Sequence, residues 1–217
     1  MPSAWLIGPL VIKSSLVVTL VSFIVAIIFY RFTSPFPKME AKQHVDQVGN
    51  ILITFIFSLW IGKILLGFAT FIKDPIAILA YPSDSNALYI GLVFTIIYVW
   101  FKYIRKQVEW TPILYAWICV FLTASFINEF VQIISGQHSR TWGYLGVLIV
   151  LLFIILFLQE KYSIVTMTSI LLVGWGLGQL LLKLVIGTTV FQFNVSLFFY
   201  SLIMVSGVLL FIFRKKV

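Results

Sequence analysis

Residues Trp142–Leu158 read WGYLGVLIVLLFIILFL, a run without a single charged side chain. Runs of this kind recur along the chain, at about the 20 residues that a helix needs to cross the hydrocarbon core of a bilayer. About seven can be placed: Leu6–Tyr30, Gly49–Ile72, Asn86–Tyr103, Thr111–Ser135, Trp142–Leu158, Ser163–Ile186 and Val195–Phe213. We therefore predict an all-α, polytopic membrane protein that forms a single integral membrane domain over residues 1–217.

The composition supports this prediction. The 217 residues are 61% hydrophobic and 10% charged, with a mean hydropathy of +1.09, whereas a soluble domain has roughly half apolar and a quarter charged residues. A soluble enzyme is therefore excluded. The single cysteine, Cys119, cannot form an internal disulfide. His44 and His138 are expected on opposite sides of a bilayer about 30 Å thick, so they cannot share a metal, and neither a metal nor a cofactor is expected.

The charge distribution predicts the orientation. The chain has 15 Lys+Arg and 7 Asp+Glu, a net charge of +8, and cytoplasmic loops of membrane proteins collect Lys and Arg. One set of alternate loops holds ten cations: Arg31, Lys38, Lys42, Lys102, Arg105, Lys106, Lys161, Arg214, Lys215 and Lys216. The other set holds Lys73 and Arg140. We predict a bacterial plasma membrane protein with its N-terminus outside and its C-terminus in the cytoplasm, and no nucleic-acid partner.

Three further stretches carry expectations of their own. Pro75 and Pro82 bracket Ile76–Tyr81, which is too short to span and is expected to lie in the interface or to enter the bilayer and return. The first apolar run lacks a basic segment before it and a small-residue cleavage site, so we expect it to be retained. The sequence GWGLG at Gly174–Gly178 follows no strand, and we interpret its glycines as a close helix-packing surface and not as a phosphate loop.

Four charged residues are expected in the outer half of the membrane: Lys13, Lys63, Glu129 and Lys183. A charge at the bilayer centre costs about 2.5–3.5 kcal/mol on insertion scales, so each needs a physical reason. The lysines can extend their ammonium groups to the surface along their aliphatic stems, or they can line a polar cavity that opens outward. Such a cluster suits a negatively charged ligand such as a phospholipid headgroup, or an internal ion-pair network.

Several stretches, in order along the chain, are similar to those of one family: Ile7–Ser15 (IGPLVIKSS), Trp60–Gly67 (WIGKILLG), Asp74–Tyr81 (DPIAILAY), Phe126–Asn128 (FIN), Gly174–Gln179 (GWGLGQ) and the last apolar run with its basic tail, 201–216. They resemble bacterial prolipoprotein diacylglyceryl transferase. The resemblance implies a site open toward the outer leaflet, where the diacylglyceryl group of phosphatidylglycerol is transferred to a prolipoprotein cysteine thiol.

The chain departs from the family pattern at the catalytic positions. The family's histidine has no counterpart in the histidine-free stretch 81–91, and its early Trp-Tyr pair falls on Ser14-Ser15. Its signature arginine falls near Leu122 and the asparagine near Ser125. A later arginine falls on Gln179 and the acid after it on Lys183. Transfer requires a thiolate and a stabilised phosphoryl-glycerol leaving group, for which a base and bidentate arginines are suited.

We therefore expect a catalytically degenerate member of the family, for which no catalytic residue can be named. The expected partner is an anionic, phosphatidylglycerol-like phospholipid, a prolipoprotein segment or another membrane protein. The predicted lipid-binding residues are Lys13, Lys63, Glu129, Gln179 and Lys183. Two alternatives stay open: an active diacylglyceryl transferase or related lipid-acyl transferase that uses other residues, and a small transporter component that uses the lysines and Glu129.

Overall fold

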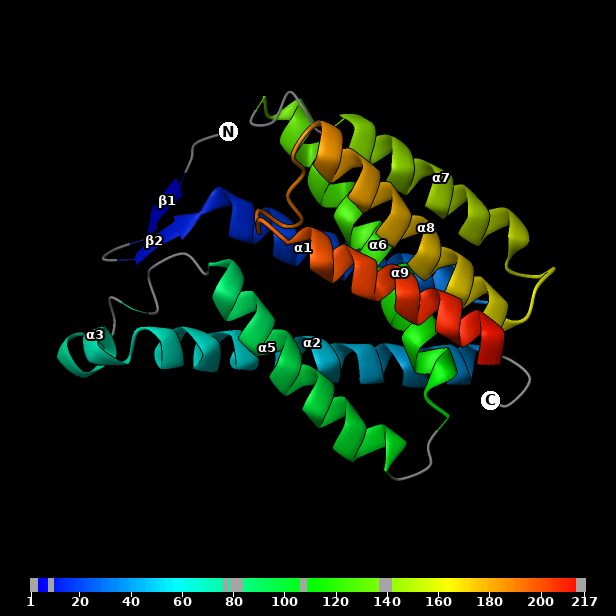
Figure 1. The fold of residues 1–217 in the computed structure, drawn as a ribbon, viewed down its shortest axis with the longest axis horizontal. Coiled ribbons are helices and arrows are strands. Elements are labelled where there is room, and N and C mark those ends of the chain that lie inside the picture. The colour runs from blue at the N-terminus through cyan, green and yellow to red at the C-terminus, as the bar shows by residue number, and fades with distance from the viewer. Residues whose placement is uncertain are drawn as a thin grey trace. The chain divides into compact units, whose positions relative to one another are not determined.

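The computed structural model describes residues 4–7, 10–75, 78, 84–105, 109–136 and 142–213; the side chains of residues 4–13 and 104 are not described. The helices are α1 (Ser14–Thr33), α2 (Lys38–Leu66), α3 (Phe68–Lys73), α5 (Ser85–Val99), α6 (Thr111–Ile134), α7 (Trp142–Leu158), α8 (Ile164–Val185) and α9 (Leu197–Ile212), with a π-helical turn η1 (Trp100–Ile104). A short hairpin of β1 (Ala4–Ile7) and β2 (Leu10–Lys13) precedes α1 (Figure 1).

The predicted helical architecture is confirmed, and it contains several apolar helices of the length expected of membrane spans. Five helices, α1, α2, α5 with its π-helical turn, α6 and α8, are long and apolar enough to cross a membrane. The apolar helices α7 and α9 are shorter, at 17 and 16 residues. The count of seven spans and the orientation stay predictions.

The prediction for the start of the first span was wrong. Helix α1 begins at Ser14 and not at Leu6, because the residues before it form an antiparallel hairpin that pairs Ala4 with Lys13 and Ile7 with Leu10. A short apolar run with β-branched residues suits a strand as well as a helix, and apolarity alone cannot separate the two. Lys13 is therefore the last residue of β2 and not part of a helix.

The second predicted span also differs from the structure. Helix α2 begins at Lys38 and ends at Leu66, whereas the sequence predicts 49–72. Its first three turns are polar, so Lys38 and Lys42, which were expected in a loop, are helical. The segment Ile76–Tyr81 lies outside the described residues apart from Ile78, which is buried.

Contacts divide the chain into two compact units, residues 1–45 with 111–217, and residues 46–110. In the second unit α5 packs closely on α2. A Cβ at Gly62 would lie 2.9 Å from the Ala87 carbonyl oxygen, and one at Gly91 would lie 3.2 Å from the Leu59 nitrogen. Asp84 caps α5 by accepting a 2.8 Å hydrogen bond from the Ala87 nitrogen.

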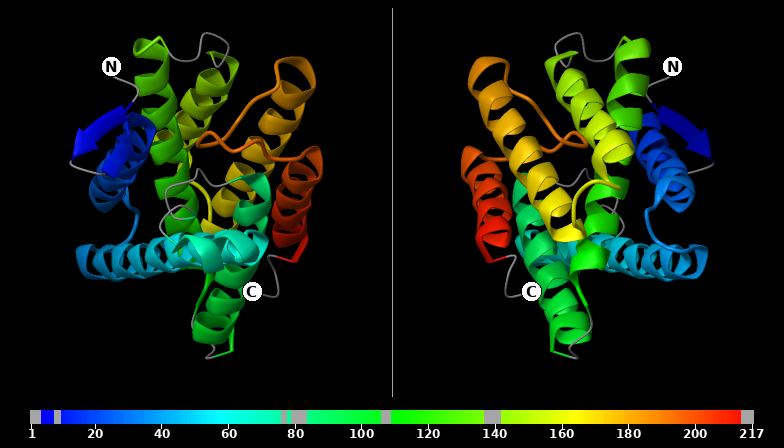
Figure 2. Two further views of the ribbon diagram at one scale, coloured as in Figure 1. Left: turned by 90° about the vertical axis from the view of Figure 1, so that its left-hand side faces the viewer. Right: turned by 90° about the vertical axis from the view of Figure 1, so that its right-hand side faces the viewer.

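The first unit, here called the bundle, contains α1, α6, α7, α8 and α9. Helix α1 packs along α6 and α8 along α9, while α7 contacts both α6 and α8 (Figure 2). Most of α6 is buried, from Thr111 to Gln132. Helices that follow one another run in opposite directions, so one end of the bundle carries Thr33, Tyr115 and Gln159 in contact with one another.

The glycines of GWGLG pack against two neighbouring helices. A Cβ at Gly178 would lie 2.7 Å from Val147 Cγ1 on α7, and one at Gly174 would lie 2.8 Å from Leu151 Cδ2. Gly176 faces α9, where a Cβ would lie 2.9 Å from the backbone nitrogen of Met204. The predicted packing role of this motif is confirmed.

We predict that Gly176→Ala destabilises the bundle by about 1–3 kcal/mol, because the new methyl group meets rigid backbone on α9. The measurement is thermal unfolding of the detergent-purified protein. Gly146→Ala on α7 is the matched control, since no atom lies within 4 Å of its Cβ position. An equal loss of stability in both variants would contradict close packing at Gly176.

Candidate functional site

Helix α6 carries four polar side chains on one face. Ser125, Asn128, Glu129 and Gln132 follow the spacing that brings residues to the same side of a helix, and each is at most 4% exposed. Because the hydrocarbon core offers no hydrogen-bond partners, buried polar groups in a membrane protein must find partners inside the protein. This face of α6 is therefore directed into the bundle.

Amide side chains connect α6 to α1. Asn128 Nδ2 donates a 2.9 Å hydrogen bond to Thr19 Oγ1, and Gln132 Nε2 donates to Asn128 Oδ1. The Thr19 hydroxyl donates in turn to the Ser15 carbonyl oxygen at 2.9 Å. These bonds give the side chains of Asn128 and Gln132 partners inside the bundle, and they join α6 to α1.

Tyr144 joins α7 to the same polar region. Its side chain is fully buried, and its hydroxyl accepts a 3.4 Å hydrogen bond from Trp175 Nε1 on α8. Ser125, Glu129 and Gln179 also lie close enough to interact with this hydroxyl. Polar groups from α6, α7 and α8 therefore converge on one buried hydroxyl.

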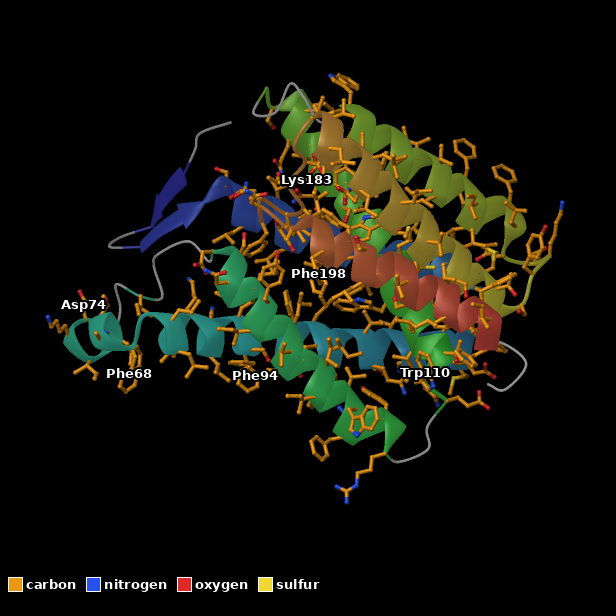
Figure 3. All side chains as sticks on the ribbon, in the orientation of Figure 1. Phe68, Asp74, Phe94, Trp110, Lys183 and Phe198 are labelled. Carbon is orange, nitrogen blue, oxygen red and sulfur yellow. The ribbon has the colours of Figure 1, made fainter. Side chains whose placement is uncertain are left out.

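The polar region continues from Gln179 to Lys183 through the loop between α8 and α9. Thr188 Oγ1 donates a 2.8 Å hydrogen bond to Gln179 Oε1. Lys183 Nζ donates to the Thr188 carbonyl oxygen at 3.2 Å and to Asn194 Oδ1. Figure 3 shows Lys183 near the end of α8, beside this loop. We call the set Ser125, Glu129, Tyr144, Gln179, Lys183 and Thr188 the polar network.

The structure thus brings together three of the five residues predicted to bind lipid, namely Glu129, Gln179 and Lys183. Lys13 ends strand β2, and its side chain is not described. Lys63 lies half-buried in the last turn of α2, in the other compact unit. The lipid-binding role of all five residues stays a prediction.

Sequence reasoning missed Tyr144 and Thr188. Tyr144 lies two residues after Trp142, in a position that resembles the aromatic belt at a membrane interface. Thr188 lies in a short loop, where a threonine carries no special signal. A single hydroxyl within an otherwise apolar helix was the available clue to Tyr144.

The chemistry of the polar network suits binding of an anion. Among the described residues, Lys183 donates only to neutral oxygens, so its positive charge is not neutralised by a carboxylate there. Ser125 Oγ and Gln179 Nε2 are buried and make no hydrogen bond within the described part of the chain. A lysine ammonium is a compact point charge that can attract a phosphate without the fork geometry of arginine.

A second polar cluster lies at the opposite end of the bundle, around the α1–α2 turn. The Tyr30 hydroxyl lies 3.3 Å from His44 Nδ1, and the Phe36 ring packs edge-on against His44 at 4.6 Å. Gln159 accepts from the Tyr115 hydroxyl at 3.1 Å and donates to the Thr33 carbonyl oxygen at 2.8 Å. These contacts hold the ends of α1, α6 and α7 together.

Over the described ranges, no group of three or more His, Cys, Asp and Glu could hold a metal ion. His138, which is predicted to lie on the other side of the membrane from His44, lies outside those ranges.

Comparison with known proteins adds no assignment: no protein-family model and no curated protein matches this chain. The resemblance to diacylglyceryl transferases stays a prediction.

We predict that Thr188→Val destabilises the protein by about 1–3 kcal/mol, because it removes the donor to a buried Gln179 oxygen. The measurement is the shift in thermal unfolding temperature of the purified protein. Thr189→Val makes the same change one residue away, at a half-buried side chain, and should leave the unfolding temperature nearly unchanged. Equal shifts would show that the Thr188 hydroxyl contributes nothing specific.

Proposed function

We propose that this protein is a non-catalytic, diacylglyceryl transferase-like membrane protein that binds the headgroup of an anionic phospholipid such as phosphatidylglycerol. The observation that carries the proposal is the polar network, which runs from Lys183 through Thr188 to Gln179. Its outer member is a cation among neutral oxygens, and its inner members are neutral hydroxyl and amide groups beside a buried carboxylate. A phosphate at Lys183 with a polar headgroup directed inward fits this order of groups.

The family resemblance supports the same location. The positions of the family's asparagine and later arginine fall near Ser125 and on Gln179, which lie on different helices. Both side chains lie near the Tyr144 hydroxyl. Residues that the resemblance assigns to one site thus lie together, although more than fifty positions separate them in the sequence.

The same residues argue against catalysis. Gln179 has no charge, and Lys183 presents a point charge in place of the family's acid. A glutamine amide is not a base, a charged lysine ammonium has no lone pair with which to accept a proton, and neither group offers a bidentate grip on the leaving phosphate. Attraction of an anionic lipid requires only the charge and the hydrogen-bonding groups.

We predict that purified protein retains phosphatidylglycerol in preference to phosphatidylcholine, and that Lys183→Gln weakens this retention about tenfold or more. The reason is the loss of a charge-assisted hydrogen bond to phosphate. Native mass spectrometry after incubation with each lipid measures the retained fraction. Lys161→Gln is the matched control, since Lys161 is exposed in the turn at the opposite end of the bundle.

Equal retention of the two lipids, or retention that is unchanged in Lys183→Gln, would overturn recognition at this lysine. Lys63→Ala and Lys13→Ala, measured in the same way, test the two predicted cations that lie outside the polar network.

We also predict that the protein fails to restore lipoprotein lipidation in a bacterial strain depleted of its authentic diacylglyceryl transferase. The physical reason is the absence of a base and of bidentate arginines at the positions that resemble the family's site. The readout is the electrophoretic mobility of a reporter prolipoprotein. Expression in the membrane is confirmed with a tagged copy, and restored lipidation would establish the enzyme alternative.

A further inference from the structure

The loop between α8 and α9 adopts a backbone conformation that its own sequence disfavours. Val190 and Phe193 exchange two backbone hydrogen bonds, of 3.0 and 2.9 Å, around a two-residue turn. Both residues of the turn are left-handed, with φ of 46° at Phe191 and 70° at Gln192. Such turns favour Asn and Gly, since other side chains are strained in this region. Contacts with the rest of the bundle must therefore hold the turn in place.

Phe191 supplies the main apolar contact. Its ring stacks on Phe23 of α1 with centroids 5.3 Å apart, and it meets Phe121 of α6 edge-on at 5.7 Å. Phe121 in turn contacts Trp175, whose Nε1 donates to Tyr144 of the polar network. Figure 2 shows the loop, drawn in orange, running inward from the ends of α8 and α9. The loop thus contacts α1 and α6 in addition to the two helices that it connects.

Lys183 supplies the main polar contact of the loop. It donates to the Thr188 carbonyl oxygen and to Asn194 Oδ1. Thr188 precedes the tight turn and Asn194 follows it. Thr188, Val190 and Val195 are 3%, 6% and 3% exposed, so both arms of the loop are packed against the bundle. The lysine that we assign to phosphate binding is thus already used to hold the loop.

We propose that the α8–α9 loop is a gate over the polar network, with Phe191 as its plug and Lys183 as its latch. An anionic headgroup opens it by replacing the Thr188 and Asn194 oxygens on Lys183. A phosphate oxygen forms a stronger, charge-assisted bond to the ammonium than a neutral carbonyl or amide oxygen does. The left-handed turn favours opening once the latch is released. The identity of the opening ligand rests on the proposed function, whereas the plug and the latch do not.

The experiment measures how fast a water-soluble methanethiosulfonate labels a buried cysteine in one arm of the loop. Val190→Cys is the reporter, because Val190 is buried and the exchange changes its volume little. The background is Cys119→Ala, which removes the natural buried cysteine. The protein is held in phosphatidylcholine nanodiscs, and we expect slow labelling in this closed state.

Phe191→Ala should raise the labelling rate about tenfold, because it removes both aromatic contacts of the plug. Phe153→Ala is the matched control: Phe153 is 56% exposed on α7 and stacks on Phe157. Gln192→Gly tests the same equilibrium in the opposite direction, because glycine relieves the left-handed strain and should slow the labelling. Its expected stabilising effect keeps the test decisive if Phe191→Ala does not fold.

Lys183→Gln should raise the rate in phosphatidylcholine, since the latch is lost, and should abolish any response to lipid charge. In the reporter protein, replacing part of the phosphatidylcholine by phosphatidylglycerol should accelerate labelling several-fold. Labelling that is insensitive to both Phe191→Ala and Gln192→Gly overturns the gate. Faster labelling in Phe191→Ala without any effect of phosphatidylglycerol overturns ligand opening and leaves the mechanical gate standing. Lysine-dependent lipid retention with no loop response to phosphatidylglycerol overturns ligand opening while the proposed function stands.

Discussion

The interior of a bilayer offers no hydrogen-bond partner to a polar group, and the architecture of this protein follows from that constraint. Backbone groups are satisfied within helices, which is why every predicted apolar run after the first is helical almost throughout its length. The β-hairpin before α1 pairs its own strands at the start of the bundle. Polar side chains that would be costly against lipid face one another inside the bundle, from α1, α6, α7 and α8.

Close helix approach and buried polarity depend on each other here. The glycines of α8 allow its backbone to lie close to α7 and α9, and this position carries Trp175 and Gln179 to the buried hydroxyl of Tyr144. Without hydrophobic attraction between helices in lipid, small residues and interhelical hydrogen bonds supply much of the packing energy. Tyr144 and Gln179 therefore take part both in the contact between α7 and α8 and in the polar network.

The α8–α9 loop extends this arrangement to the surface. Thr188 of the loop bonds to Gln179 of the network, Phe191 stacks on α1, and the loop accepts hydrogen bonds from Lys183. Strained backbone is retained in proteins where surrounding contacts hold it, often at sites that bind ligands. The loop, Lys183 and the polar network are joined by hydrogen bonds. A change of partner at Lys183 therefore removes contacts that hold the loop in place.

The sequence by itself determined a helical protein of the membrane type, because its apolar runs are long and nearly free of charge. The ends of these runs lie within a few residues of most observed helix ends. The sequence also marked Glu129, Gln179 and Lys183 as residues of interest, because charge or amide groups in apolar helices are conspicuous. Apolarity could not distinguish the strands of 4–13 from a helix, and it did not reveal the division into two compact units. Only the tertiary structure decided that Tyr144 and Thr188 complete the network and that Phe191 reaches α1 and α6, because these contacts join residues that are distant in the chain and depend on which helix faces meet.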